Sequence, residues 1–107
     1  MAEQTPAARR EAGKDVLSSL RGGGVDADAI ASATEDRLGP LGSFVVDFAL
    51  GDVWTRPGLT RRDRSLIVVS MLATLNQLNQ LRAHVQGAIN HGLTRTEVEE
   101  VMVQLGG

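Results

Sequence analysis

Helix start and stop signals recur along the whole sequence, and they constrain the fold more than any other feature. Thr94 and Glu97 have the spacing of a capping box, in which each side chain accepts a hydrogen bond from a backbone N–H that the helix leaves unpaired. Thr60 and Asp63 repeat that spacing. Strand patterns, in which apolar and polar residues alternate between turn pairs, are missing. The sequence therefore predicts an all-α fold.

Helix start and stop signals and apolar periodicity together divide the chain into six expected helices. They cover residues 5–20, 28–36, 40–50, 60–75, about 78–91 and 94–105. Glycines are expected to end the first helix at 22–24 and the third at Gly51. The apolar face expected for the third helix consists of Leu41, Phe44, Val45 and Phe48. The face expected for the fifth helix consists of Leu78, Leu81, Val85, Ala88 and Ile89. The face expected for the sixth helix consists of Val98, Val101, Met102 and Leu105.

Length and composition fit a single globular domain over residues 1–107, with 42% hydrophobic and 22% charged residues. The formal net charge of -2 supplies no field that would attract nucleic acid or an anionic membrane. Because cysteine is absent, disulfides, thiolate metal sites and thiol redox chemistry are excluded. No stretch approaches the roughly 18 apolar residues of a membrane span, so we expect a cytoplasmic protein.

Four polar side chains follow one edge of the apolar face of the fifth helix: Gln77, Gln80, His84 and His91. A pocket wall has its polar groups in such a place, although an exposed helix side or a subunit contact fits the same stripe. His84, beside Leu81 and Val85, can move a proton near neutral pH, or it is a core histidine bonded to a backbone carbonyl. His91 stands at a helix C-terminus, where the helix dipole favours a cation.

A cationic segment precedes and begins the fourth helix. Trp54 and Arg56 flank a rigid Pro-Gly turn, and a cation held there can bind a carboxylate. The alternative is that Trp54 packs in the core while Arg56 pairs with Asp52. Three arginines, Arg61, Arg62 and Arg64, then occupy the positive end of a helix, where cations are unfavourable. We expect at least one of them to face a bound anion or a neighbouring chain.

Metal and phosphate sites have little support in the sequence. Two histidines seven residues apart, with glutamates at 97, 99 and 100, do not give a strong metal-ligand spacing. The glycines at 22–24 follow a helix, whereas a phosphate-binding loop precedes one. We therefore predict no metal.

Two segments together resemble the carboxymuconolactone decarboxylase family: GDVWTRPGLTRRDRSL from Gly51 to Leu66, and HVQGAINHGLTRTEVEEVMVQ from His84 to Gln104. The pattern is W-x-R-P-G-L, R-S-L, H-x-x-x-A-x-x-x-G-L-T and E-x-x-E-V, and it covers about half the chain. A related peroxidase branch of the alkylhydroperoxidase D-like superfamily carries a Cys-x-x-Cys pair where this chain has Gln77 and Gln80. The resemblance is therefore to the decarboxylase branch.

The resemblance implies a helical bundle that assembles as a ring, a homotrimer or homohexamer, with pockets near subunit contacts. It implies the family's named reaction, the loss of carbon dioxide from 4-carboxymuconolactone in the β-ketoadipate route of aromatic-compound breakdown, without a cofactor. The substrate's conjugated carbonyl system accepts the electron pair that carbon dioxide leaves behind. The protein must then supply a cation for a carboxylate, donors for the oxyanion and an acid that protonates carbon.

The same resemblance implies roles for individual residues. Arg56 or Arg64 holds a substrate carboxylate, Gln80 donates to the oxyanion, and His84 delivers the proton. The expected remaining contacts of the substrate, including an apolar wall, come from Trp54, Gln77 and Phe48.

The chain departs from the family pattern at two of these positions and leaves other functions open. The decarboxylase branch usually has Glu where this chain has Gln80, and a polar residue, often His, where it has Phe48. The core of the resemblance covers residues 40–105, and the helix that follows it in the family is expected to be absent. The alternatives are a decarboxylase, isomerase or cyclase for another small unsaturated substrate, and a catalytically silent subunit that binds a small molecule.

Overall fold

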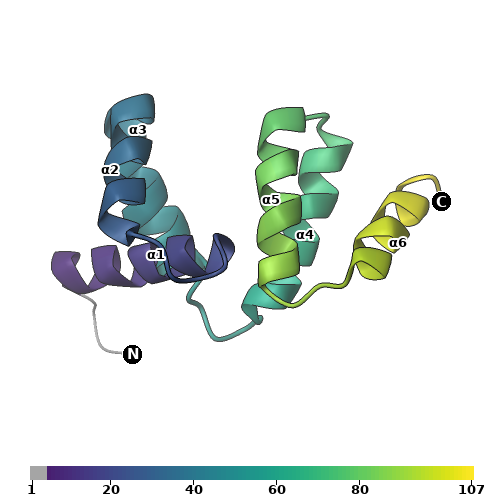
Figure 1. The fold of residues 1–107 in the computed structure, drawn as a ribbon, viewed down its shortest axis with the longest axis horizontal. Coiled ribbons are helices and arrows are strands. Elements are labelled where there is room, and N and C mark those ends of the chain that lie inside the picture. The colour runs from purple at the N-terminus through teal and green to yellow at the C-terminus, as the bar shows by residue number, and fades with distance from the viewer. Residues whose placement is uncertain (1–4) are drawn as a thin grey trace. The chain divides into compact units, whose positions relative to one another are not determined.

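The computed structural model describes residues 5–107, and every regular element in that range is helical, as the sequence predicts (Figure 1). In chain order the elements are α1 (Pro6–Leu20), α2 (Ala27–Leu38), α3 (Pro40–Phe44), η1 (Val45–Val53), α4 (Arg61–Thr74), α5 (Leu78–Asn90) and α6 (Arg95–Leu105). Contacts between them gather into two compact units, residues 5–19 with 23–57 and residues 20–22 with 58–107.

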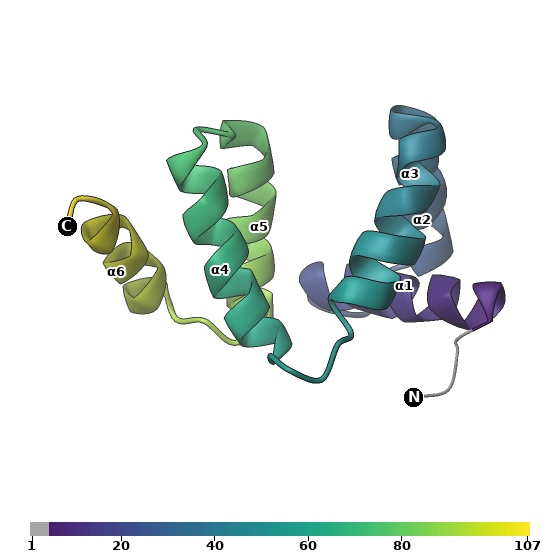
Figure 2. The same ribbon diagram turned by 180° about the vertical axis from the view of Figure 1, so that it is seen from behind.

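In the first unit α1 lies across η1, and two glycines allow the backbones to touch (Figure 2). A Cβ on Gly13 would stand 1.9 Å from the Val46 carbonyl oxygen, and one on Gly51 would stand 2.4 Å from the Arg9 carbonyl oxygen. No side chain larger than hydrogen fits at either place without moving the backbone. The buried apolar residues of this unit are Val16, Leu17, Ala31, Val46, Leu50 and Trp54.

The expected third helix differs from the prediction in its end and in its buried face. It does not stop at Gly51 but continues as the π-helix η1 to Val53, with the Trp54 N–H donating to the Ala49 carbonyl at 3.1 Å. Gly42, Val46 and Leu50 are buried, whereas three residues of the expected face are exposed: Leu41 by 65%, Phe44 by 57% and Phe48 by 42%. The close approach of α1 decides which face is covered, and that approach requires small residues rather than the most apolar ones.

Ion pairs join α1 to the other helices of the first unit. Arg9 donates to the Asp52 carboxylate, with nitrogen–oxygen distances of 3.0 and 2.8 Å. Arg10 pairs with Glu35 of α2 and, at 3.3 Å, with Asp47 of η1. The hydrogen bond from Arg10 and a second from Ser43 hold the pKa of Glu35 below its usual value. Two helices are therefore tied to α1 through adjacent arginines.

In the second unit α4 packs against both α5 and α6 (Figure 1). The buried core consists of Val69, Ala88, Leu93 and Val101, covered by Leu66, Leu81, Val85 and Val98. The prediction for α5 was wrong at Leu78, which is 62% exposed, and at the exposed Ile89. Met102 and Leu105 of α6 are exposed as well. The expected stripes were wider than the surface that neighbouring helices of this unit cover.

At α6 the predicted capping box is complete, and at α4 the threonine hydrogen bond of the predicted box is formed. The Thr94 side chain accepts from the Glu97 N–H and the Glu97 carboxylate accepts from the Thr94 N–H, which completes the capping box of α6. The Thr60 hydroxyl accepts from the Asp63 N–H at the start of α4. Asn76, with φ of 57°, makes the turn between α4 and α5 in the left-handed conformation that asparagine tolerates.

Within residues 5–107 no helix has the length and apolar character required to cross a membrane.

The glycine contact between α1 and η1 can be tested by substitution. Gly13→Ala should lower the free energy of unfolding by about 3 kcal/mol, the upper range for overpacking, because its methyl group would meet backbone and not a flexible side chain. Gly58→Ala is the matched control, since a Cβ there meets no atom within 4 Å. Chemical denaturation followed by circular dichroism measures both. Equal stability of the two variants would contradict the contact.

Candidate functional site

The seven predicted site residues fall in the two units. Phe48, Trp54 and Arg56 belong to the first unit, and Arg64, Gln77, Gln80 and His84 belong to the second. The convergence of the two sets in one pocket stays a prediction.

In the first unit Trp54 and Phe48 have different surroundings. Trp54 is buried, so the interpretation that it packs in the core is confirmed. Phe48 stacks on Phe44 with ring centroids 4.9 Å apart, and both rings reach the surface. Arg56 is exposed on the turn that follows η1, and the Asp52 carboxylate suggested as its partner is bound by Arg9. The Trp-x-Arg segment therefore places an indole inside the unit and a guanidinium outside it.

In the second unit α4 and α5 carry the other four residues. Arg64 lies in the first turns of α4 and is half-buried. Gln77 is the residue before α5, Gln80 lies in its first turn, and both side chains are exposed. His84, one turn further along, is half-buried beside Leu81 and Val85 of the core. The polar stripe therefore runs from solvent at its beginning into the edge of the core at His84.

The burial of His84 controls its charge. Removing the imidazole from water disfavours its cationic form, which lowers the pKa of His84 below the ordinary value of 6.5. The resting side chain is therefore mostly neutral at pH 7, ready to accept a proton. It can donate one to carbon only after an anion nearby raises that pKa.

His91 has a role that the sequence did not reveal. Its ring Nδ1 lies 2.8 Å from the Oγ of Ser65, a residue of α4 with no exposed surface. Burial, the charge of Arg61 and the neighbouring His84 together lower the pKa of His91, and a hydrogen bond with the Arg61 backbone acts against them. His91 caps α5 as its position predicts, but the cation favoured at that helix end is opposed, first by burial of the ring and then by the charge of Arg61. Helical spacing within α5 could not identify this partner.

One of the three arginines of α4 has its partner in α6. Arg62 forms an ion pair with Glu97 and a longer contact of 3.5 Å with Asp63. The hydrogen bonds from the Thr94 backbone and from Arg62 lower the pKa of Glu97. The expectation of a bound anion or neighbouring chain is therefore not required to explain Arg62.

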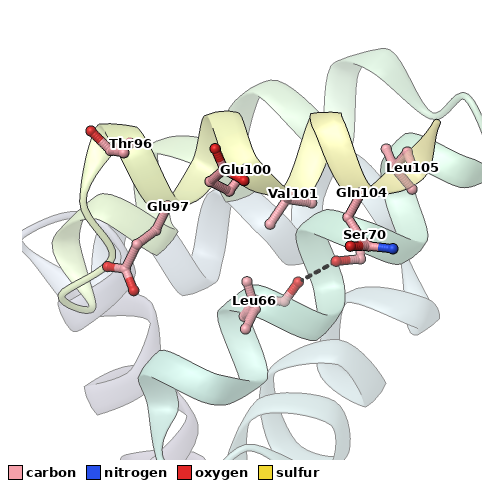
Figure 3. Close-up of a pocket in the computed structure, with 8 residues that line it drawn as sticks. All are labelled: Leu66, Ser70, Thr96, Glu97, Glu100, Val101, Gln104 and Leu105. Carbon is pink, nitrogen blue, oxygen red and sulfur yellow. Dashed lines mark hydrogen bonds between the residues drawn. The ribbon is translucent and has the colours of Figure 1, made fainter. Parts of the chain in front are cut away.

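A groove of about 470 Å³ lies between α4 and α6 (Figure 3). Val101 and Gln104 of α6 point toward Leu66 and Ser70 of α4, whose hydroxyl donates to the Leu66 carbonyl at 2.8 Å. The other lining residues are Thr96, Glu97, Glu100 and Leu105. None of the seven predicted site residues lines this groove. Among the described residues no group of three or more histidines and carboxylates could hold a metal ion.

A comparison with known protein families identifies the family of this chain. A sequence profile of the carboxymuconolactone decarboxylase family matches residues 40–106, which is more than half of the chain. This stretch runs from α3 to the end of α6 and includes all seven predicted site residues. The chain therefore belongs to the carboxymuconolactone decarboxylase family.

Two curated relatives carry the names of decarboxylases. A 4-carboxymuconolactone decarboxylase of Acinetobacter baylyi is 39% identical over 61 residues, which are 57% of this chain and 46% of that protein. A nitrosuccinic acid decarboxylase of Metarhizium robertsii is 36% identical over 64 residues, which are 60% of this chain and 45% of that protein. The matches thus cover about half the length of each relative.

The charge state of His84 gives a measurable pH dependence. The His84 resonance should titrate with a midpoint below 6.5, because burial disfavours the imidazolium. Between that midpoint and pH 6.5 the unfolded chain binds more protons than the folded one, so the free energy of unfolding should fall as the pH is lowered through this window. A proton NMR titration of His91→Asn, which leaves His84 as the one imidazole, measures the midpoint. A midpoint above 6.5 would contradict the buried setting.

Proposed function

We propose that this chain is a cofactor-independent decarboxylase for a small unsaturated lactone or carbonyl acid, with 4-carboxymuconolactone as the first substrate to test. The observation that carries the proposal is the family match over residues 40–106, which places the half-buried His84 within the matched segment. A decarboxylase function is supported by the names of both relatives.

The proposed reaction breaks the bond between a ring carbon and its carboxylate. Carbon dioxide leaves, and the electron pair of the broken bond moves into the conjugated carbonyl, whose oxygen becomes negative. The pair then returns to carbon, which takes a proton and gives the enol-lactone. The protein lowers the barrier by holding the carboxylate, stabilising the oxyanion and supplying the proton.

Each step has a proposed residue. Arg64 or Arg56 holds the carboxylate through a charge-assisted hydrogen bond. Gln80, whose amide is exposed at the start of α5, donates to the oxyanion, and His84 one turn later gives the proton to carbon. Trp54, Gln77 and Phe48 form the remaining wall. Convergence of these residues depends on the arrangement of the two units and of neighbouring chains.

The lowered pKa of His84 fits this sequence of events. Without substrate the imidazole is mostly neutral, so the site holds no permanent cation at that position. Binding of an anionic substrate raises the pKa of a nearby histidine by Coulombic attraction. The substrate's own charge would thus create the acid that protonates carbon. Because the negative charge passes to the oxyanion when carbon dioxide leaves, the pKa would stay raised until the proton is transferred.

Exposed apolar surfaces support the proposal that the protein assembles as a homotrimer or homohexamer. In the first unit, Leu41, Phe44 and Phe48 form one exposed face. In the second, Ile67 and Met71 of α4 and Leu75 at its C-cap lie at intervals of four and are also exposed. Contiguous apolar surface of this kind is a mark of contact with another chain. The ring-shaped assembly, the cytoplasmic location and the absence of a cofactor stay predictions.

Two departures from the family pattern favour a second candidate function. Gln80 cannot exchange a proton as the usual Glu does, and Phe48 is an apolar ring where a polar residue is typical. A less acidic and more apolar pocket suits another acid or an unsaturated carbonyl compound that is isomerised or cyclised, and the relative named for nitrosuccinic acid supports a different acid. A subunit that binds a small molecule without turnover would show the same substitutions.

Removal of the imidazole tests the proposed acid. His84→Ala should lower turnover of 4-carboxymuconolactone by about 100-fold or more, the scale typical of a positioned proton donor. Gln86→Ala, an exposed position of the same helix that hydrogen-bonds to Asn90, is the control and should keep wild-type turnover. Loss of substrate absorbance with release of carbon dioxide measures the reaction. Unchanged turnover of His84→Ala would reject the role of His84.

Assembly is tested by the molar mass of the full chain in solution. Light scattering after size-exclusion chromatography should give three or six chain masses. Met71→Glu, which places a charge on the exposed apolar stripe of α4, should give a smaller species, whereas Glu99→Gln on the exposed side of α6 should not. A monomeric wild-type chain would contradict the ring.

A further inference from the structure

A polar side-chain contact joins Ser65 of α4 to His91, the residue that ends α5. Ser65 Oγ lies 2.8 Å from His91 Nδ1, and Ser65 has no exposed surface. Of the two histidines, His91 is the one that the proposed reaction does not use. Its position between the end of α5 and the first turns of α4 indicates that it holds these two helices together near the candidate site.

The backbone holds the His91 ring in place at the end of α5. The His91 N–H donates to the Gly87 carbonyl at 2.9 Å, which makes His91 the C-cap of the helix. The chain then turns through Gly92, with φ of 106°, and the Leu93 N–H donates to the Ala88 carbonyl at 3.0 Å. Leu93 is buried in the core. Because both sides of His91 are fixed, its ring is a rigid partner for α4.

On the other side of the contact, Ser65 is the neighbour of Arg64. The Arg64 N–H donates to the Thr60 carbonyl at 3.0 Å, so Arg64 and Ser65 belong to the same first turns of α4. Any shift of Ser65 toward or away from α5 moves the Arg64 backbone with it. The placement of the guanidinium therefore depends on what holds Ser65.

The surroundings of His91 favour a neutral ring. A hydroxyl can both donate and accept, so the bond to Ser65 is possible in either protonation state. Burial of the ring and the titratable groups that act on it, Arg61 of α4 and His84 of α5, disfavour an imidazolium, whereas a hydrogen bond with the Arg61 backbone favours it. Protonation of His91 therefore loosens the junction between the two helices.

We propose that His91 is a positioning residue that, through Ser65, fixes the first turns of α4 against the end of α5 and so sets the position of Arg64. The part of this inference that concerns substrate rests on the proposed function, in which Arg64 holds a carboxylate. The part that concerns the helices does not, and the two are tested separately.

The structural part is tested on the full chain without substrate. In wild type, the backbone amide resonances of Arg64 and Ser65 should shift together with the His91 imidazole as the pH is lowered. In His91→Asn, whose amide keeps a hydrogen-bonding group for Ser65 but does not titrate, the shift should vanish while the fold is kept. Glu99→Gln, at an exposed position of α6, is the control and should behave as wild type. Amide shifts at 64 and 65 that follow no histidine would overturn the proposal.

The functional part is tested with 4-carboxymuconolactone. His91→Ala and Ser65→Ala should each raise KM by about tenfold with little change in kcat, and the double variant should be no worse than either single one, as expected for partners in one contact. His91→Asn should restore most of the affinity. Additive effects of the two alanine variants, or an unchanged KM in both, would contradict a positioning role.

The structural part and the functional part of the proposal are contradicted by different experimental results. If the wild-type chain turns over no 4-carboxymuconolactone, the proposed substrate is wrong, and the amide titration still decides whether His91 holds α4. If His91→Ala does not fold, His91→Asn and Ser65→Ala supply the same comparison, and equal pH profiles of KM in wild type and His91→Asn would exclude the positioning role.

Discussion

The packing of α5 on α4 is the interaction on which the candidate site depends. Val69 of α4 and Ala88 of α5 have almost no exposed surface, and they form the buried core of the second unit together with Leu93 and Val101. The two helices carry Arg64 and His84, so the same burial that stabilises the unit also sets the charge state of the proposed acid. Stability and chemistry are thus coupled through one helix pair, and the polar bond at its end, between Ser65 and His91, fixes how the pair is aligned.

The main constraint in the first unit is the close crossing of α1 and η1. Glycines at 13 and 51 remove the side chains that would separate the two backbones, and adjacent arginines of α1 bind carboxylates on two helices. The result leaves Phe44 and Phe48 stacked on the surface. Apolar surface is therefore available in this unit for contact with another chain.

Local signals in the sequence predicted most of the fold. Capping residues interact with backbone groups two or three positions away, so Thr94, Glu97 and Thr60 could be assigned without knowledge of any distant residue. The candidate site was less predictable. The partial burial of His84 followed from its apolar neighbours, and the burial of Trp54 was one of two alternatives that the sequence left open. The partners of Arg62 and His91 lie 35 and 26 positions away and have no periodic signature.

The sequence by itself determined the helical class, the ends of the last helices and the family, because these depend on local hydrogen bonds and on residue types in fixed spacing. Only the tertiary structure decided which faces are buried and which charges meet. The most apolar face of the third helix lies outside because the face that carries Gly42 and Gly51 allows close backbone contact, and Val46 and Leu50 are buried with it. Packing buried the His91 ring between Ser65 and the charge of Arg61, which opposes the cation that its own helix end favours, and no pattern along one helix contains that information.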